Sequence, residues 1–130
     1  MAYFEAREPE HAWVREQFAA VDGPLTTCEP VVAECLFILR RYGRDHRGLF
    51  EAMRRGALRV DFQLGPERAV LDEMMTQYAD LPMSLADACL VRMAELNPRA
   101  EIITLDRHFK LYRTRDRRVL KLRLPPERKT

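Results

Sequence analysis

Hydrophobic residues recur along the chain at two spacings, one helical and one extended, and the two kinds of segment alternate. Helical stripes are predicted in residues 11–21, 30–41, 49–55, 66–78 and 84–96, with a short helix around residues 109–112. Extended segments are predicted at residues 25–27, 57–61, 101–105 and 119–122. Strands that alternate with helices in this way predict a single α/β domain over residues 1–130, a sandwich with a largely parallel sheet.

The most apolar helical stretch is PVVAECLFILRR, residues 30–41, and we expect Thr27 to cap it. One ionisable group, Glu34, stands in the middle of its apolar run, and Val31, Phe37 and Ile38 share its helix face. Burying a lone carboxylate costs several kcal/mol or more unless a cation, a metal or a proton compensates. Glu34 is therefore predicted to have either a buried arginine partner or a chemical role.

Two further acids occupy similar positions. Asp87 lies in the apolar helix SLADACLVRMAEL, where Ser84 and Asp87 also form a variant of the helix capping box. Asp106 follows the strand EIITL and could be an N-cap. Taken alone, each acid is better explained as a cap. Together with Glu34 they could converge beyond the carboxyl ends of parallel strands, where functional groups collect.

Composition places few limits on function. The net charge is +2 and 47% of residues are apolar. No apolar run is long enough to span a membrane and no signal peptide is recognisable, so we expect a cytoplasmic protein. Three cysteines lack metal-ligand spacing and are expected to be reduced packing residues. Residues 107–130 carry ten Lys or Arg and two acids, which suits either a polyanion partner or a solvated edge strand.

Converging carboxylates repel one another, and a hard divalent cation such as Mg²⁺ or Mn²⁺ relieves that repulsion through oxygen ligands. An acidic cluster beside basic residues is the arrangement used in metal-assisted phosphodiester hydrolysis, where basic groups hold phosphates. The three histidines, His11, His46 and His108, share no metal spacing and are expected at the surface or at helix ends.

Three segments, TTCEPVVAECLFILRR, MSLADACLVRMAE and ITLDRHFKLYR, resemble in order and spacing the motifs of the PIN-domain ribonucleases, particularly the VapC-like toxins. The resemblance spans essentially the whole chain. It implies a three-layer α/β/α sandwich and an Mg²⁺- or Mn²⁺-dependent endoribonuclease. Glu34, Asp87 and Asp106 fall on the family's acidic positions, and Thr104 matches a polar position that orients water or metal. The family also implies an RNA substrate, an antitoxin protein partner and a homodimer.

The sequence departs from the family in one respect. The family begins with a central apolar strand that ends in a metal-binding aspartate, shortly before a segment resembling AYFEAREPEH; here Met1 follows that point. Three explanations stay open: a start codon placed too late, a gap filled by another segment or chain, or an inactive member. We favour the first, and expect metal binding and cleavage by residues 1–130 to be impaired.

Two other functions remain under consideration. One is a catalytically inactive PIN-like protein that binds an antitoxin-like peptide or RNA. The other is a receiver-like signalling domain, which also groups acids at strand ends. That fold requires paired acids after its first strand, and these are missing here.

Overall fold

The computed structural model describes residues 16–17, 19–20 and 23–126 of the chain, and within them helices and strands alternate as predicted. The four apolar residues of the first predicted stripe (Trp13, Val14, Phe18 and Val21) lie outside the described residues. The strands are β1 (Leu25–Cys28), β2 (Leu58–Phe62), β3 (Ile102–Ile103) and β4 (Leu122–Arg123); the helices are α2 (Glu29–Arg41), α3 (Arg47–Arg54), α4 (Arg68–Gln77) and α5 (Leu85–Leu96), with 3-10 turns η1 (Gly65–Glu67) and η2 (Arg107–Lys110). In the described part of the chain, no helix has the length and apolar character needed to cross a membrane.

Two glycines end the helices that precede β2. After α2, Gly43 has a φ of 70° and donates its N–H to the carbonyl of Arg40, while Arg44 donates to Leu39. Gly56 has a φ of 76° and closes α3 with the same pair of bonds. This is the Schellman arrangement, and it needs a left-handed residue that glycine adopts without steric cost. The chain can therefore turn back sharply after each helix.

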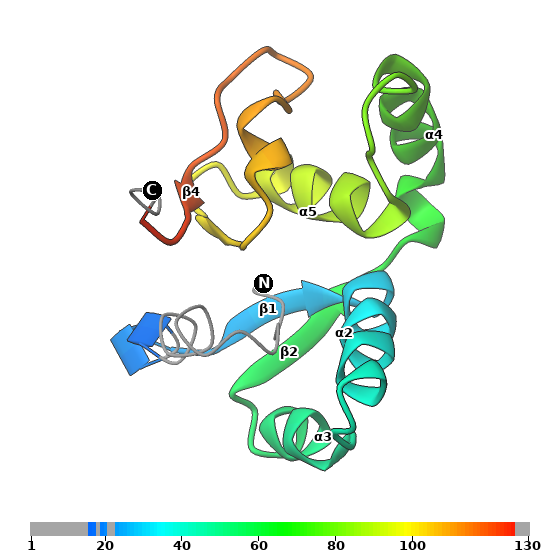
Figure 1. Ribbon diagram of the computed structural model, residues 1–130. Helices are drawn as coiled ribbons and strands as arrows, with labels where there is room; N and C mark the ends of the chain where they lie inside the picture. Colours follow the sequence, from blue (N-terminus) through cyan, green and yellow to red (C-terminus); the bar gives the residue numbers. More distant parts are fainter. Residues whose placement is uncertain (1–15, 18, 21–22, 127–130) are drawn as a thin grey trace.

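The four strands form two separate parallel pairs in the described residues. β1 pairs with β2, with Leu25 opposite Leu58, and β3 pairs with β4, with Ile102 opposite Leu122. Figure 1 shows the β1–β2 pair with α2 and α3 in one half of the molecule, and β4, α4 and α5 in the other. The parallel direction was predicted correctly, whereas the strands do not join into one continuous sheet.

In β1 and β3, the hydrogen bonds show which residues direct their backbone groups toward the paired strand and which direct them away from it. In a strand, successive residues direct their backbone groups to opposite sides. Leu25 donates its N–H toward β2, to Ala57, so Thr26 faces away from β2. Ile102 and Thr104 donate toward β4, so Ile103 faces away from β4. Backbone groups of β1 and β3 are thus directed out of their own pairs.

A groove of about 710 Å³ lies between the strand pairs, and both outward-facing residues, Thr26 and Ile103, line it. Its walls also carry β2 and β4 residues, and α5 contributes Leu90 and Met93. The groove therefore has strand edges on two sides and a helix against it.

Helix α5 is the centre of the core and contacts α2, α4 and β1. More than half of its residues are buried: Ala86, Asp87, Ala88, Cys89, Leu90, Val91 and Ala94. Its packing brings the N-terminal turn of α5 beside α2. The three cysteines are free and buried, as the sequence predicted.

Some local predictions were wrong. The strand expected over residues 101–105 has only two residues in β3, and the last strand lies at Leu122–Arg123 rather than 119–122. Thr27 is part of β1, so Cys28 takes the N-cap position of α2 and no side chain caps that helix. Phe50, in the apolar helical stripe predicted over residues 49–55, is 50% exposed. Propensity alone does not locate such boundaries, because tertiary packing decides them.

Candidate active site

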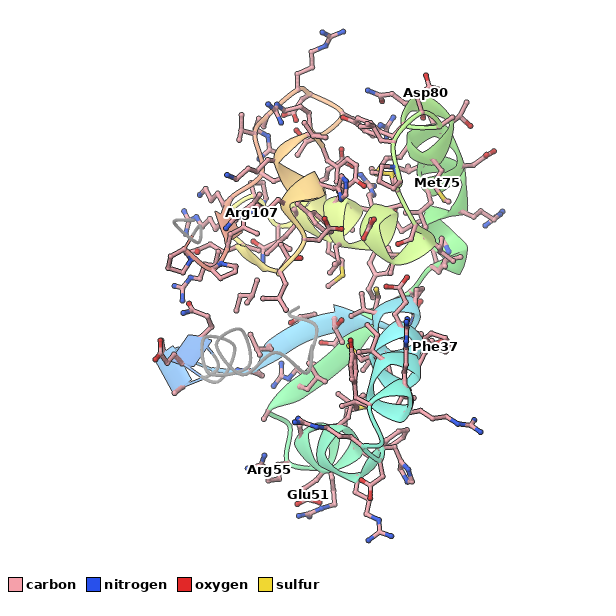
Figure 2. The ribbon with its side chains drawn as sticks, viewed as in Figure 1. Phe37, Glu51, Arg55, Met75, Asp80 and Arg107 are labelled. Atoms are coloured by element: carbon pink, nitrogen blue, oxygen red, sulfur yellow. The ribbon has the colours of Figure 1, made fainter. Side chains whose placement is uncertain are left out.

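The three acids predicted to converge line one pocket. It has a volume of about 460 Å³ and is lined by Glu34, Ile38, Pro82, Ser84, Asp87, Leu105, Asp106 and Arg107. The acids come from three separate elements, α2, α5 and the turn after β3. In Figure 2, Arg107 lies in the half of the molecule that contains α5, and Phe37 marks α2 in the other half. Because α2 contributes Glu34 and Ile38 to the lining, the pocket is built from both halves.

Glu34 lies in the second turn of α2, between the fully buried Val31 and Cys35 and the exposed Phe37. The sequence predicted an apolar environment for its carboxylate. The structure corrects this: Glu34 is half-buried at the rim of the pocket, and Phe37 is 68% exposed. Its helix face therefore leads the carboxylate to the pocket rather than into the core.

Asp87 is the most buried of the three acids, at 5% exposed. It closes a capping box with Ser84: its own N–H donates to Ser84 Oγ at 3.1 Å, and its Oδ2 accepts from the Ser84 N–H at 3.1 Å. The capping role suggested by the sequence is confirmed, and Asp87 lines the pocket as well. Burial, with smaller contributions from the charges of Asp106 and Glu34, raises the pKa of Asp87 above its usual value.

Asp106 is held by the residues on both sides of it. Its Oδ1 accepts a hydrogen bond of 2.8 Å from the His108 N–H and contacts His108 Nδ1 at 2.7 Å, which makes it the N-cap of η2. Its own N–H donates to Thr104 Oγ1 at 3.0 Å. Thr104 is fully buried, so its hydroxyl is directed at the Asp106 backbone. The same carboxylate is thus both a cap and a wall of the pocket.

The donor set matches a hard divalent cation in kind, because three carboxylates and a serine hydroxyl offer oxygen ligands. Their distances are wider than one ion requires. Among the described residues no group of three His, Cys, Asp or Glu side chains is close enough together to hold a metal. The residues present therefore fit a metal by chemistry and by shared pocket, and would have to draw closer to ligate it together.

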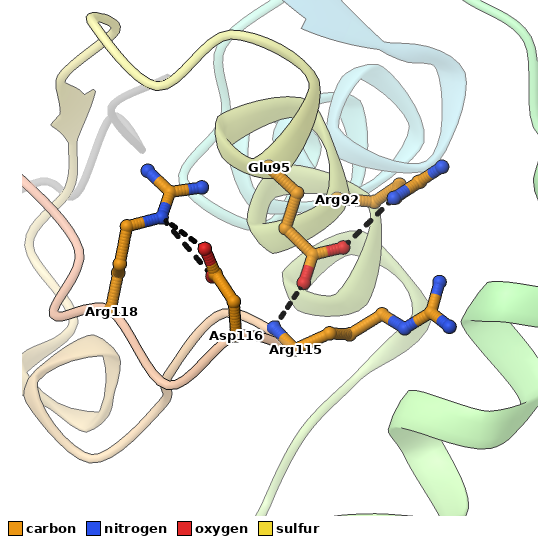
Figure 3. Close-up of a pocket in the computed structure, with 5 residues that line it drawn as sticks. All are labelled: Arg92, Glu95, Arg115, Asp116 and Arg118. Carbon is orange, nitrogen blue, oxygen red and sulfur yellow. Dashed lines mark hydrogen bonds and ion pairs between the residues drawn. The ribbon is translucent and has the colours of Figure 1, made fainter.

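The basic residues after η2 are largely engaged with internal partners. Figure 3 shows a second pocket, of about 410 Å³, in which Glu95 accepts hydrogen bonds from Arg92 and from the backbone N–H of Arg115. In the same pocket Arg118 contacts Asp116 at 2.8 Å. Arg92 also binds Glu67 at 2.7 Å. Because carboxylates already neutralise these arginines, this pocket is a structural clamp between α5 and the loop that precedes β4.

These features, parallel strands alternating with helices and three acids on one pocket, define a class, and comparison with known proteins identifies it. Residues 1–114 match the PIN domain model. The chain belongs to the PIN-domain family. It is 32% identical over 116 residues to Ribonuclease VapC26 of Mycobacterium tuberculosis, a match that covers 87% of this chain and 86% of the relative.

Sequence reasoning did not assign a role to two residues that contact the acids. His108 was expected at the surface or at a helix end, and its contact with Asp106 was not predicted. A histidine two residues after an acid at a strand end is a pattern that could have indicated this contact. Tyr112 falls in the short helix predicted around residues 109–112, and no role was assigned to it. It is fully buried and its hydroxyl reaches Asp87 Oδ2 at 3.3 Å. The residues lie 25 positions apart, so no local pattern could have joined them.

Proposed function

We propose that this protein is a divalent-metal-dependent endoribonuclease of the VapC toxin type, which hydrolyses RNA phosphodiester bonds at the acidic pocket. The observation that carries the proposal is the shared pocket of Glu34, Asp87 and Asp106, which come from three elements far apart in the sequence. Family membership and the similarity to a ribonuclease support it. An antitoxin protein and a second copy of the chain are the partners that this family implies.

Each acid has a role in this proposal. Asp87 and Asp106, both fixed by hydrogen bonds, would hold Mg²⁺ or Mn²⁺ with Glu34, which can approach from α2. A bound divalent cation lowers the pKa of water and stabilises the charge that develops on the phosphodiester oxygens. The acids keep the pocket attractive to cations, and Arg107 in its lining can contact a phosphate of the substrate.

We also infer that the groove between β1 and β3 accepts one further parallel strand. Its edges, at Thr26 and Ile103, direct backbone groups out of their own strand pairs, and a strand between them would join the four strands into one sheet. The family places a strand that ends in aspartate at the centre of its sheet. Such a strand would complete the three-layer sandwich and bring a fourth carboxylate to the acid pocket.

The experiment compares RNA cleavage in Mn²⁺ by residues 1–130 and by a version extended upstream of Met1 with an apolar strand that ends in aspartate. We expect the extended version to cleave, and Asp106→Asn to lower its rate by about 100-fold or more. Asp45→Asn is the control, because Asp45 is an exposed acid beside Arg47, away from the pocket lining. An extended protein that cleaves no RNA, or an Asp106→Asn variant as active as its parent, would remove the proposal.

One observation favours a second function. Because no three ligands in the described residues are close enough together for a metal, the acidic pocket could instead bind a basic peptide without catalysis. Calorimetry separates the two functions. The enzyme is expected to bind Mn²⁺ through the three acids, whereas the binding protein would bind an arginine-rich peptide and no Mn²⁺.

A further inference from the structure

Tyr112 is a polar side chain enclosed in the core behind the acidic pocket. It is 0% exposed, and it is the largest fully buried side chain in the described part of the protein. Its hydroxyl donates to Asp87 Oδ2 at 3.3 Å. A tyrosine hydroxyl is protonated at neutral pH, so it acts as a hydrogen-bond donor to the carboxylate.

The hydrogen bonds of Asp87 are unequally divided between its two oxygens. Oδ2 accepts from the Ser84 backbone N–H at 3.1 Å and from the Tyr112 hydroxyl at 3.3 Å. Both donors therefore hold the same oxygen. Oδ1 receives neither of these two bonds, and it is the oxygen that we assign to a ligand in the pocket that Asp87 lines. Two donors from different elements fix the carboxylate plane better than the capping box alone.

The ring of Tyr112 is itself held in place. It packs edge to face between Tyr78 and Phe109, with ring centroids 5.3 Å from each. The Tyr78 hydroxyl accepts the Arg113 N–H at 2.9 Å, which ties the neighbouring ring to the backbone. A donor on a ring packed in this way has little freedom to follow Asp87, so the tyrosine constrains the acid.

We propose that Tyr112 is a positioning residue that orients Asp87 so that its Oδ1 faces the metal-binding pocket. This inference rests on the proposed function, since it assigns Asp87 to a metal. Tyr112 is not among the residues that line the acid pocket. It acts through the hydrogen bond to Asp87 Oδ2, and it links the segment after η2 to the N-terminal turn of α5.

The test is Tyr112→Phe, which removes the hydroxyl and keeps the ring. Tyr78→Phe is the matched control, because it removes a part-buried hydroxyl of the adjacent ring whose partner is the Arg113 backbone instead of Asp87. Mn²⁺ affinity is measured by calorimetry on the full chain, and thermal unfolding is measured in EDTA. We expect Tyr112→Phe to weaken Mn²⁺ binding by about 10-fold, the loss typical of groups that orient a metal ligand.

The expected pattern is a loss of Mn²⁺ affinity in Tyr112→Phe that Tyr78→Phe does not share, with thermal unfolding lowered in both. Equal Mn²⁺ affinity in the wild type and Tyr112→Phe would overturn the inference and leave the proposed function standing. Equal losses of affinity in the two variants would also overturn it, because they would indicate general loosening of the core. A protein that binds no Mn²⁺ even when it is extended by the upstream strand would remove the metal site and the inference with it.

Discussion

The backbone N–H of Asp106 donates a hydrogen bond of 3.0 Å to the hydroxyl of Thr104, a side chain with no exposed surface. Thr104 also donates its own N–H to the carbonyl of Arg123 in the neighbouring strand. One threonine thus ties the end of the β3 segment both to β4 and to the acid that follows it. The backbone of Asp106 is thus held by Thr104, while its carboxylate is held by His108.

We predict that Thr104→Val weakens both folding and metal binding. The substitution keeps the shape but leaves the Asp106 N–H without its acceptor, so the free energy of unfolding should fall by about 1–2 kcal/mol. Mn²⁺ affinity should fall by about 10-fold, because the backbone that carries Asp106 is less constrained. Urea unfolding and calorimetry measure the two effects.

The control for this variant is Thr76→Val, whose hydroxyl donates to the Asp72 carbonyl within α4 at an exposed position. It should leave Mn²⁺ affinity unchanged. If Thr104→Val bound Mn²⁺ as tightly as the wild type, Thr104 would have no part in placing Asp106.

Asp87→Asn should stabilise the metal-free protein while it removes metal binding. Burial, and to a smaller extent the charges of Asp106 and Glu34, raise the pKa of Asp87 in the folded state above the 3.8 of an unperturbed aspartate. As pH rises from that value to the raised pKa, the Asp87 carboxyl ionises in the unfolded chain before it ionises in the folded protein. The free energy of unfolding of the wild type therefore falls over this pH window. Asparagine does not ionise and still accepts from the Ser84 N–H.

The measurement is urea unfolding of both proteins in EDTA at pH 4 and pH 7.5. The advantage of Asp87→Asn should be larger at pH 7.5, and Asp45→Asn, at an exposed position, should show no such trend. A wild type that gains stability relative to Asp87→Asn as pH rises would contradict the predicted direction. It would mean that the capping box favours the ionised carboxylate more than burial opposes it.

The sequence singled out the three acids that line the pocket because each stands out locally. Glu34 interrupts an apolar helix, Asp87 begins one, and Asp106 follows a strand. Their convergence on one pocket agrees with the rule that parallel strands present their carboxyl ends together. The Tyr112 contact with Asp87 could not be predicted, because it depends on how the chain after η2 packs across α5.

The fold was predictable in its elements and less so in its sheet. Gly43 and Gly56 marked two helix ends, since only a left-handed residue completes those caps. The division into two strand pairs does not follow from hydrophobic pattern, because pairing depends on contacts between distant segments. Val119 shows the difference: it was expected in an edge strand, yet it is 68% exposed and forms only an isolated bridge with Arg113.

Glu95→Ala should destabilise the protein without changing the acid pocket. The Glu95 side chain is 7% exposed and accepts from Arg92 at 3.0 Å and from the backbone N–H of Arg115. Removing a largely buried acceptor of two donors should lower the free energy of unfolding by about 2 kcal/mol. Mn²⁺ affinity should be unchanged, since the pocket of Figure 3 is separate from the acid pocket.

A matched control exists on α3, where Glu51 pairs with Arg54 at the same spacing along a helix as Arg92 and Glu95. Both side chains of that pair are exposed, so Glu51→Ala should have little effect on unfolding. Equal effects of Glu95→Ala and Glu51→Ala would show that the clamp between α5 and the loop contributes no more than a surface pair.

The three cysteines should react slowly with thiol reagents until the protein unfolds. Cys28 and Cys89 are 0% exposed and Cys35 is 1% exposed. Burial raises the pKa of Cys35 to about 11, so at pH 8 only about one in a thousand Cys35 side chains is the reactive thiolate. A chromogenic disulfide reagent at pH 8 should therefore give no fast phase with the native protein and three equivalents in urea. One rapidly reacting equivalent in the native protein, lost in Cys35→Ser, would contradict this prediction. It would mean that solvent reaches the face of α2 opposite the exposed Phe37. The core around α5 would then be looser than its packing indicates.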